Sequence, residues 1–422
     1  MKTMKDLLCL YLFLAGLCAV THCHEEDVCH EVNNTNLHDG AEHLLKHHCG
    51  KQGSAYADFA FRFYKQVIAK EADKNVFFSP MSISTAFALL ALGAKSSTLS
   101  QILEGLGFGS VDEAHVEDIH ESFHEVLAVL NCTDANITLN IGNALFTAIG
   151  YEPQEAFLKN TKQFYDADFF PINFHKEIEA KTQINNYVKE KTKEKIPELV
   201  DQLGRNTIMV IVNYIYFKAA WEKAFDPEFT YEDDFLVKPN VSVRVNMMRR
   251  EDNYNIYYDQ DLSCTVVELP YHGTARALLI LPDDGKMEQV EDALSKETIC
   301  KWDNKLENRR VNLHLPKTSI SGSYDIKELL EEMGITDVFS SNADLSGITG
   351  SRDLQVSQAI HKALLEVDET GTEAAGATAI VVTKVLLPFV TISFNRPFTI
   401  LISDKATGIT LFLGKVVDPT QK

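Results

Sequence analysis

The chain has 422 residues, of which 45% are hydrophobic and 24% are charged, so it can bury a large core and lacks the composition of a disordered protein. Its formal net charge is −20. This balance argues against a general nucleic-acid or heparin-binding surface, because phosphate and sulfate groups are bound by clustered Lys and Arg side chains.

Residues 1–21 have the pattern of a secretory signal peptide, with cleavage expected somewhere between residues 18 and 24. A short basic start precedes an apolar run over residues 7–17, and small residues follow near Cys18 and Ala19. The run is too short to span a membrane, and no later segment reaches about 18 consecutive apolar residues. We therefore expect a secreted, extracellular protein that has no membrane partner.

Residues 22–50 differ from the rest of the chain because they hold seven of its fourteen His residues and show little apolar periodicity. This composition predicts a mobile tail. Imidazole and thiolate groups bind zinc and similar metals, so the tail offers candidate metal ligands: His24, His30, His47 and His48, each beside a Cys or another His. Their spacing matches no standard zinc finger. We therefore favour a solvated tail and expect neither a metal nor a cofactor.

Secretion agrees with the cysteine and sequon content. Six Cys remain after the signal peptide, namely Cys23, Cys29, Cys49, Cys132, Cys264 and Cys300, and their spacing fixes no disulfide pairing. Four sequons predict a glycoprotein with attachment at Asn33, Asn131, Asn136 and Asn240. Asn131 and Asn136 are close enough for steric crowding to limit them to one glycan.

From residue 51 the chain reads as one globular domain that extends to residue 422. Apolar periodicity predicts helices over residues 55–70, 79–94 and 112–130, the second beginning at a Ser cap followed by Pro. Strands are predicted over residues 75–78, 207–217, 264–270, 275–281, 398–403 and 410–417. The segment 207–217 is too continuously apolar to have a solvated face, so we expect it in the centre of a sheet. The predicted fold class is α+β.

One string resembles a catalytic motif. Residues 120–124 read HESFH, which fits the HExxH pattern of zinc proteases on a predicted helix. Position 127 is Leu, so the extended form of the motif fails, and no clear third ligand follows. We interpret His120 and His124 as two solvated side chains on an acidic helix. No GxSxG, P-loop or GxGxxG motif is present, so we do not expect an enzyme.

The segment ETGTEAAGATAIVVTKV, residues 369–385, passes from turn-forming residues through very small ones to β-branched ones. With it go NVFFSPMSIS (75–84), NYIYFKAAWEKAF (213–225), HLPK (314–317), MGITDVFSSNADLSGIT (333–349), HKALLEVDETGTEA (361–374), FNRPF (394–398) and FLGKVVDPTQK (412–422). In this order they resemble the serpins over about residues 51–422, and most closely the secreted alpha-1-antitrypsin-like members (clade A).

The resemblance implies three β-sheets, eight to nine helices and an exposed reactive-centre loop. It also implies suicide inhibition of a serine protease, in which the cut loop enters the main sheet while the protease stays covalently attached. Serpin loop insertion is itself a standard example of strand addition to a sheet. The alternative is a non-inhibitory serpin, such as a carrier, a storage protein or a metal-binding plasma protein that uses the His-rich tail.

The loop residues have the chemistry that insertion requires. Strand alternation puts Thr372, Ala374, Gly376, Thr378, Ile380 and Val382 on one face, with Glu373, Ala375, Ala377, Ala379, Val381 and Thr383 on the other. No Pro interrupts residues 369–387, so every backbone N–H can join a ladder. The predicted hinge comprises Glu369, Gly371, Thr372, Glu373, Ala374, Ala375, Gly376 and Ala377, where Gly371 allows the backbone to change conformation.

Further roles follow from the resemblance position by position. It places Ser79, Pro80, Ser82, Asn213 and His361 where the central strands separate, in a buried polar network that would hold the sheet closed. It places Trp221 at the top of the opening. It pairs Lys317 with Glu369 to tie the base of the loop to the sheet, a pair that contributes little energy if it is exposed.

Counting seventeen residues from Glu369 makes Val385–Leu386 the first candidate for the reactive bond, which suits an elastase-like protease. The register is open by one residue. Leu386–Leu387 would suit a chymotrypsin-like enzyme, and Lys384–Val385 a trypsin-like one. The acidic helix over residues 112–130 carries no Lys or Arg, so we expect no heparin activation, and we expect a monomer.

Overall fold

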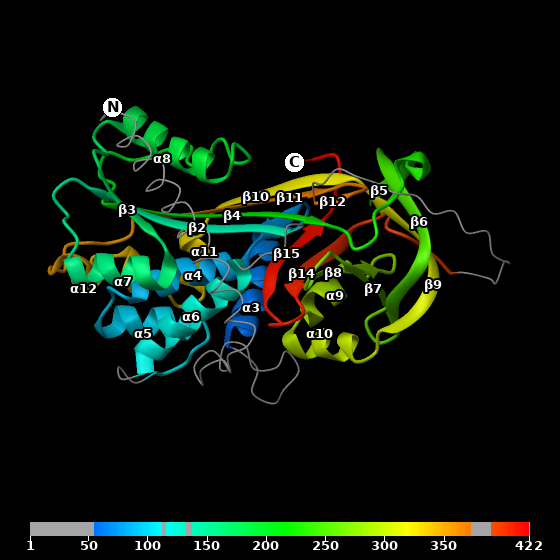
Figure 1. Ribbon diagram of the computed structural model, residues 1–422, viewed down its shortest axis with the longest axis horizontal. Helices are drawn as coiled ribbons and strands as arrows, with labels where there is room; N and C mark the ends of the chain where they lie inside the picture. The colour runs from blue at the N-terminus through cyan, green and yellow to red at the C-terminus, as the bar shows by residue number, and fades with distance from the viewer. Residues whose placement is uncertain (1–54, 112–114, 132–136, 373–389, 422) are drawn as a thin grey trace, which may run out of the picture.

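Two hydrogen-bonded sheets organise the computed structural model, which describes residues 55–111, 115–131, 137–372 and 390–421 (Figure 1). The α-helices are α3 (Ala55–Lys70), α4 (Pro80–Ala91), α5 (Ser96–Gly105), α6 (Val116–Asn131), α7 (Glu155–Tyr165), α8 (Glu177–Lys191), α9 (Met287–Ala293), α10 (Lys296–Asp303), α11 (Lys327–Glu332) and α12 (Ser346–Thr349), and the 3-10 helices are η2 (Pro227–Phe229) and η3 (Asp337–Phe339). The predictions for the signal peptide and the tail lie outside the described residues.

The main sheet has the strand order β10-β11-β4-β2-β3, with β12 paired to the end of β4. Its strands are β2 (Ile137–Ala148), β3 (Asp168–Ile172), β4 (Met209–Ala220), β10 (Thr318–Asp325), β11 (Gln358–Val367) and β12 (Gly371–Thr372). The first nine residues of β4 are all buried, which confirms the central strand predicted from its continuous apolar run. The β4–β11 contact is parallel, whereas the β4–β2 contact is antiparallel.

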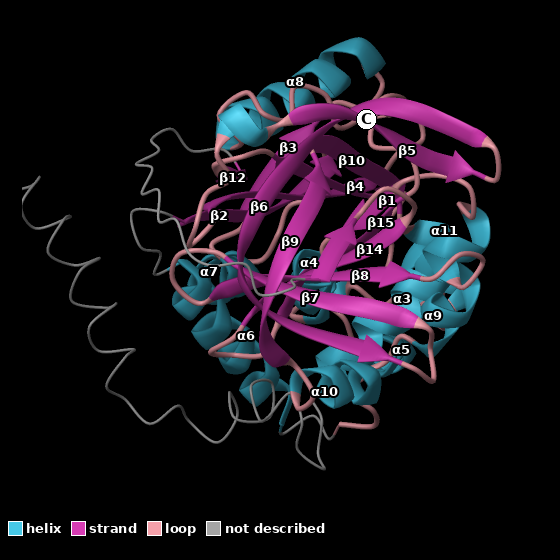
Figure 2. Ribbon diagram, turned by 90° about the vertical axis from the view of Figure 1, so that its right-hand side faces the viewer, coloured by secondary structure: helices cyan, strands magenta, loops and turns pink. Residues whose placement is uncertain are grey.

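The second sheet contains the remaining described strands, in the order β1-β15-β14-β8-β7-β6-β9-β13 with β5 paired to β6. They are β1 (Val76–Phe78), β5 (Tyr231–Lys238), β6 (Val241–Asp259), β7 (Cys264–Pro270), β8 (Ala275–Pro282), β9 (Glu307–Pro316), β13 (Val390–Ser393), β14 (Phe398–Asp404) and β15 (Thr410–Val416). Helices α3, α9 and α11 lie along one side of β8, β14 and β15 (Figure 2).

The α+β fold class is confirmed, but the described strands form two hydrogen-bonded sheets where three were expected. The reason is the 19-residue β6. Its N-terminal part pairs with β5, its middle part with β9 and its C-terminal part with β7, so one strand joins what would otherwise be two sheets. The described residues also contain ten α-helices rather than eight or nine, because the short α11 and α12 count separately.

Helices cover both faces of the main sheet. In Figure 1, α8 lies above the sheet and α4, α6 and α7 lie below it. Below the sheet lies the large core, to which every strand of the second sheet also contributes. Above it, α8 closes a smaller core that includes Ala180, Ile184 and Val188. Burial on both faces explains why β4 reads as one apolar run rather than as an alternating pattern.

Most predicted elements occur at or near their predicted bounds, and α4 is the informative exception. Ser79 caps α4 through its hydroxyl, which accepts from the Ser82 N–H, and Pro80 occupies the first turn as predicted. The helix ends at Ala91 rather than at residue 94. A Cβ at Gly93 would stand 2.2 Å from Ile348 Cγ1, so this close approach of α12 requires Gly just after the helix end.

The interpretation of His120 as a solvated side chain is wrong. His120 is 4% exposed, and its Nδ1 lies 2.6 Å from the Tyr165 hydroxyl on α7. His120 precedes Phe123 by three residues, so it lies on the same face of α6 and is buried with it. Burial lowers the pKa of His120 to about 4. His124 is exposed, as expected.

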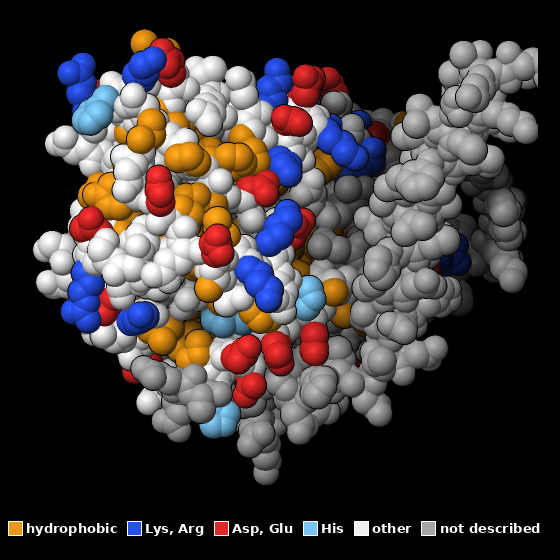
Figure 3. Space-filling model, turned by 60° about the vertical axis from the view of Figure 1, so that its left-hand side comes forward, with side chains coloured by type: hydrophobic (Ala, Val, Ile, Leu, Met, Phe, Trp, Pro, Cys, Tyr) orange, Lys and Arg blue, Asp and Glu red, His pale blue; other side chains and the backbone are white. Residues whose placement is uncertain are grey.

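The remaining motifs concern metal binding and membrane insertion. Within the residues that the structure describes, no group of three or more His, Cys, Asp or Glu side chains is placed to hold a metal ion. None of the helices in this part of the chain is long and apolar enough to cross a membrane. On the face shown in Figure 3, Lys and Arg side chains are interspersed with Asp and Glu rather than gathered into one field.

Candidate functional site

A row of polar side chains crosses four adjacent strands of the main sheet, from the edge strand β10 to β2. Tyr324 on β10 lies opposite His361 on β11, His361 lies opposite Asn213 on β4, and Asn213 lies opposite Asn143 on β2. Residues opposite one another in a ladder share a face of the sheet. His361, Asn213 and Asn143 are all buried, so this row places polar groups inside an otherwise apolar layer.

The row is held to the start of α4 by hydrogen bonds. His361 Nε2 accepts from the backbone N–H of Ser79 at 3.0 Å, and His361 Nδ1 lies 2.6 Å from Asn213 Oδ1. The Asn213 amide nitrogen donates to Ser82 Oγ at 2.6 Å and to Asn143 Oδ1 at 2.7 Å. Ser79, Pro80, Ser82, Asn213 and His361 therefore meet at one place, as the resemblance implied.

The hydrogen bonds fix the protonation state of His361. Nε2 must be bare because it accepts a backbone N–H, so Nδ1 carries the proton and donates to Asn213 Oδ1. The ring is fully buried, and burial lowers the pKa of His361 to about 3. The imidazole is thus neutral in the folded chain at neutral pH.

Asn143 is the member of this network that sequence reasoning missed. The strand that carries it, β2, was not predicted, because its register depends on long-range pairing with β4. The local signal was weak, because Asn143 is one of two Asn residues in this strand, the other being Asn140. An amide at such a position requires a partner, which here is the Asn213 side chain.

Acidification is expected to destabilise this network through His361. Its pKa is about 3 when folded and about 6.5 when unfolded, so the unfolded chain binds more protons between those values. The stability contributed by the neutral ring is complete above pH 6.5 and falls by about 1.4 kcal/mol per pH unit below it. Wild-type protein should therefore lose about 2 kcal/mol more than a His361→Gln variant between pH 7.5 and pH 5.

The measurement is guanidinium unfolding of both proteins at the two pH values. His120 also has a lowered pKa, but it is present in both proteins and cancels in the comparison. Equal losses in wild type and variant would show that His361 does not carry the acid sensitivity.

A second cluster forms at the base of the loop, around Glu369. The Lys317 Nζ lies 2.7 Å from Glu369 Oε2, and the Thr230 hydroxyl donates to Oε1 at 2.8 Å. Glu369 is only 8% exposed, so this is not the exposed pair whose energy would be small. Burial would raise the pKa of Glu369, but the hydrogen bonds from Lys317 and Thr230 outweigh it and hold the pKa below its usual range.

Trp221 joins the same base to the end of β4. Its ring stacks on Tyr271 with centroids 4.2 Å apart, and the side chain is 1% exposed. Its indole N–H donates to the Asp368 carbonyl at 3.0 Å, and its backbone N–H donates to the Thr370 carbonyl at 3.0 Å. The residues before the loop are thereby held against the C-terminal end of β4.

Gly371 sits where the chain turns back onto β4. It lies opposite Ala220, and Thr372 lies opposite Ala219, in an antiparallel ladder. The φ of Gly371 is +140°, and a Cβ there would stand 2.3 Å from the Ala219 carbonyl oxygen. Both observations require Gly. The rest of the predicted hinge and the candidate reactive bonds lie outside the described residues: Glu373, Ala374, Ala375, Gly376, Ala377, Lys384, Val385, Leu386 and Leu387.

Of the four sequon Asn residues, two lie within the described residues and two lie outside them. Asn240 occupies the turn between β5 and β6, where it is exposed with a φ of +64°. Asn131 is the last residue of α6. Asn33 and Asn136 lie outside the described residues. Exposure at a hairpin turn makes Asn240 sterically open to glycosylation, which stays a prediction.

Comparisons with known proteins give one consistent result. A family profile described as serpin (serine protease inhibitor) matches residues 54–419. Alpha-1-antiproteinase 2 from Equus caballus is 46% identical over 97% of this chain and 98% of its own. Alpha-1-antichymotrypsin from Homo sapiens is 44% identical over 100% of both chains. Human thyroxine-binding globulin in complex with thyroxine is 40% identical, with a TM-score of 0.84 over 90% of this chain and 100% of its own.

Proposed function

The chain belongs to the serpin family, and we propose that it is a secreted serine-protease inhibitor that acts as a suicide substrate rather than as an enzyme. In this proposal the protease cuts one bond within residues 373–389, the loop that follows β12. The loop then inserts between β4 and β11 while the protease remains bound to it as an acyl-enzyme.

The observation that carries the proposal is the position of β12. Gly371 and Thr372 already pair with β4 in the antiparallel sense, whereas β11 runs parallel to β4. A strand that continued from β12 would therefore run antiparallel to both neighbours. Seven parallel residue pairs join β11 to β4, from Gln358↔Val210 to Leu364↔Tyr216. Insertion would replace this parallel ladder with two antiparallel ones, which are more stable per residue.

The sequence after β12 supports the same mechanism. On one face the side chains that would enter first are Thr372, Ala374 and Gly376, and no Pro occurs between β12 and Pro388, so the backbone can join both ladders. The polar row around His361 and Asn213 lies in the path of the incoming strand. We assign it the role of holding the sheet closed until the loop is cut.

The reactive bond in this proposal is Val385–Leu386, which favours an elastase-like protease as partner. Leu386–Leu387 and Lys384–Val385 remain alternatives that would point to chymotrypsin-like and trypsin-like partners. The signal peptide pattern supports action outside the cell. The hinge role of residues 369–377 and the tether role of Lys317 and Trp221 are part of the same proposal.

The alternative is a carrier without inhibitory activity. It is favoured by the similarity to thyroxine-binding globulin, whose structure was solved with thyroxine bound. The two functions differ in one consequence: an inhibitor must trap a protease covalently, and a carrier has no need to do so.

Incubation with pancreatic elastase, neutrophil elastase, chymotrypsin or trypsin, followed by denaturing gel electrophoresis, tests the proposal. We expect a band at the summed mass of the two proteins with at least one elastase, and mass spectrometry of the complex should locate the cut at Val385 or within one residue of it. The melting temperature should rise after the loop is cut. Cleavage without a covalent band, and without that rise, would contradict the inhibitory mechanism.

A further inference from the structure

Two isoleucine side chains stand out by their exposure to water. Ile178 is 84% exposed and Ile149 is 68% exposed, and the next most exposed large hydrophobic residue within the described parts of the chain is Phe229 at 57%. Ile149 directly follows β2, and Ile178 lies in the first turn of α8. Exposed apolar residues that are scattered singly are normal, so the position of these two relative to each other decides whether they form a surface.

Ile149 lies beside the start of β4. The Ala148 N–H, one residue earlier, donates to the Ile208 carbonyl at 2.7 Å, and the Ile149 N–H donates to the Ile172 carbonyl at 3.1 Å. Ile208 directly precedes β4, and Ile172 ends β3. Ile149 is therefore exposed at the end of the main sheet where β4 begins.

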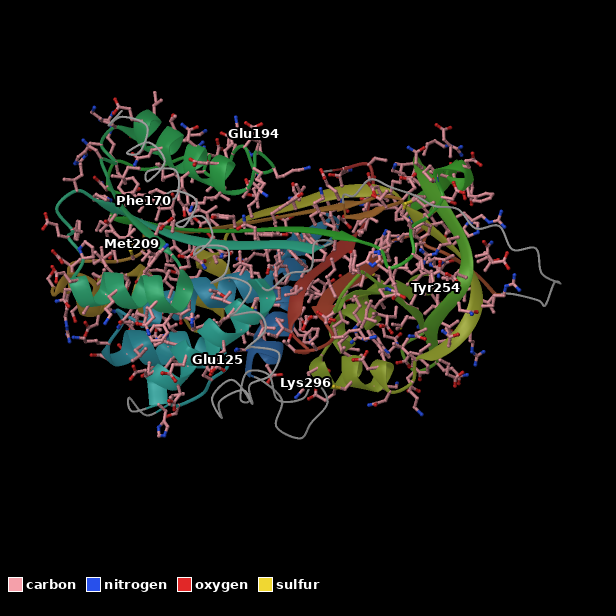
Figure 4. The ribbon with its side chains drawn as sticks, in the orientation of Figure 1. Glu125, Phe170, Glu194, Met209, Tyr254 and Lys296 are labelled. Atoms are coloured by element: carbon pink, nitrogen blue, oxygen red, sulfur yellow. The ribbon has the colours of Figure 1, made fainter. Side chains whose placement is uncertain are left out.

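Ile178 lies beside the same segment of the chain. Arg205 Nε donates to Glu177 Oε1 at 3.0 Å, which joins the residues before β4 to the first residue of α8, and Ile178 is the next residue of that helix. Figure 4 labels Met209, the first residue of β4, at this end of the molecule, and Tyr254 on β6 at the opposite end. The two most exposed apolar side chains thus share one end of the molecule; we refer to Ile149 and Ile178 as the β4-start patch.

The register of β12 indicates where an inserted loop would carry a protease. Thr372 lies opposite Ala219 in an antiparallel ladder, so each further residue of an inserted strand faces a residue one step earlier in the chain of β4. Continued without a bulge, this register puts Val385 opposite Asn206, three residues before β4 begins. A domain of about 150–250 residues has a radius of gyration of about 15–18 Å. A protease that is covalently joined to Val385 would therefore cover the surface around Asn206.

We propose that the β4-start patch contacts the trapped protease, and that Ile149 and Ile178 become buried against an apolar part of its surface and lengthen the life of the covalent complex. This inference rests on the proposed function, because it requires a loop that is inserted with the protease attached. The patch is reached only after the loop is cut. It therefore acts on how long the complex persists and not on how fast the two proteins first meet.

The patch would act on the balance between two states of the trapped protease. In one state the protease packs against the patch and the ester at Val385 persists. In the other it has moved away, and water hydrolyses the ester: the hydroxyl adds to the Val385 carbonyl carbon, a proton returns to the protease serine, and free protease and cut chain are released. Burial of two isoleucine side chains favours the first state by removing apolar surface from water, and so reduces the population that can hydrolyse.

The test is the rate at which the purified covalent complex of the full chain releases active protease, followed over days with a chromogenic peptide substrate of that protease. The double variant Ile149→Ser, Ile178→Ser should release protease about 5-fold to 30-fold faster than wild type, and each single variant should lie between the two. The second-order rate constant for formation of the complex should not change.

Val241→Ser is the matched control, because Val241 is 52% exposed and lies at the turn between β5 and β6, away from the start of β4. Its complex should release protease at the wild-type rate. Equal release from wild type, the double variant and Val241→Ser would overturn the role of the patch and leave the proposed function intact. If wild type forms no covalent complex with any of the proteases, both the proposed function and the patch are overturned.

Discussion

If the chain acts by the proposed inhibitory mechanism, replacing Thr372 by Arg is expected to convert it into a substrate. Thr372 lies opposite Ala219, which is fully buried in the large core below the main sheet. An arginine carried into the sheet at this register would bring an unpaired charge into an apolar layer, at a cost of several kcal/mol. If about 3 kcal/mol of that cost falls on the insertion step, insertion slows by about 100-fold.

The consequence follows from competition between two rates. The acyl-enzyme either hydrolyses or is trapped by insertion, so slower insertion allows hydrolysis to win. Gel analysis should show a cut Thr372→Arg chain, free active protease and little covalent complex. Thr372→Ser, which adds no charge, is the control and should trap protease nearly as wild type does. Full trapping by Thr372→Arg would mean that position 372 does not enter the core face.

Elements defined by local pattern were predictable from the sequence. The helix Ala55–Lys70 and the strand Cys264–Pro270 have the predicted bounds, because apolar periodicity and turn residues are read over a few neighbours. Burial of His120 was not predicted, because the sequence pattern does not show which side of α6 packs against α7. The end of α4 was misplaced for a similar reason, since the approach of Ile348 to Gly93 is a contact between residues far apart in sequence.

The site shows the same division between local and long-range information. The family resemblance predicted that Asn213 and His361 lie in one network, and the register of β4 against β11 places them opposite each other. Asn143 was not predicted because it lies on a third strand, 70 residues before Asn213, and no local sequence pattern indicates that the two amides are in contact. The depth of Glu369 depends likewise on Thr230 and Lys317, which come from two other segments.

The largest effect on stability is expected from Asn213→Ala. Asn213 is 1% exposed, and its amide makes four hydrogen bonds that would be lost, with His361 Nδ1, Ser82 Oγ, the Ser82 carbonyl and Asn143 Oδ1. Each buried polar group left without a partner costs about 1–3 kcal/mol, so the free energy of unfolding should fall by about 3–5 kcal/mol. Guanidinium unfolding measures the loss. Asn140→Ala on β2 is the control, because it removes only one hydrogen bond, from Nδ2 to the Lys191 carbonyl, and should cost less than about 1 kcal/mol.

The position of Asn213 implies that the loss of stability in Asn213→Ala is accompanied by polymerisation. The lost bonds lie between β4 and its neighbours β11 and β2, so the variant should separate those strands more readily than wild type. A sheet that opens without a cut loop can accept a strand from another molecule. The loop of a second copy could supply that strand, since residues 372–383 contain no Pro and are mostly small or apolar. Mild heating of Asn213→Ala should therefore produce polymers on a native gel at temperatures that leave wild type and Asn140→Ala monomeric. Loss of stability without polymers would show that the polar row supports folding but does not keep the sheet closed.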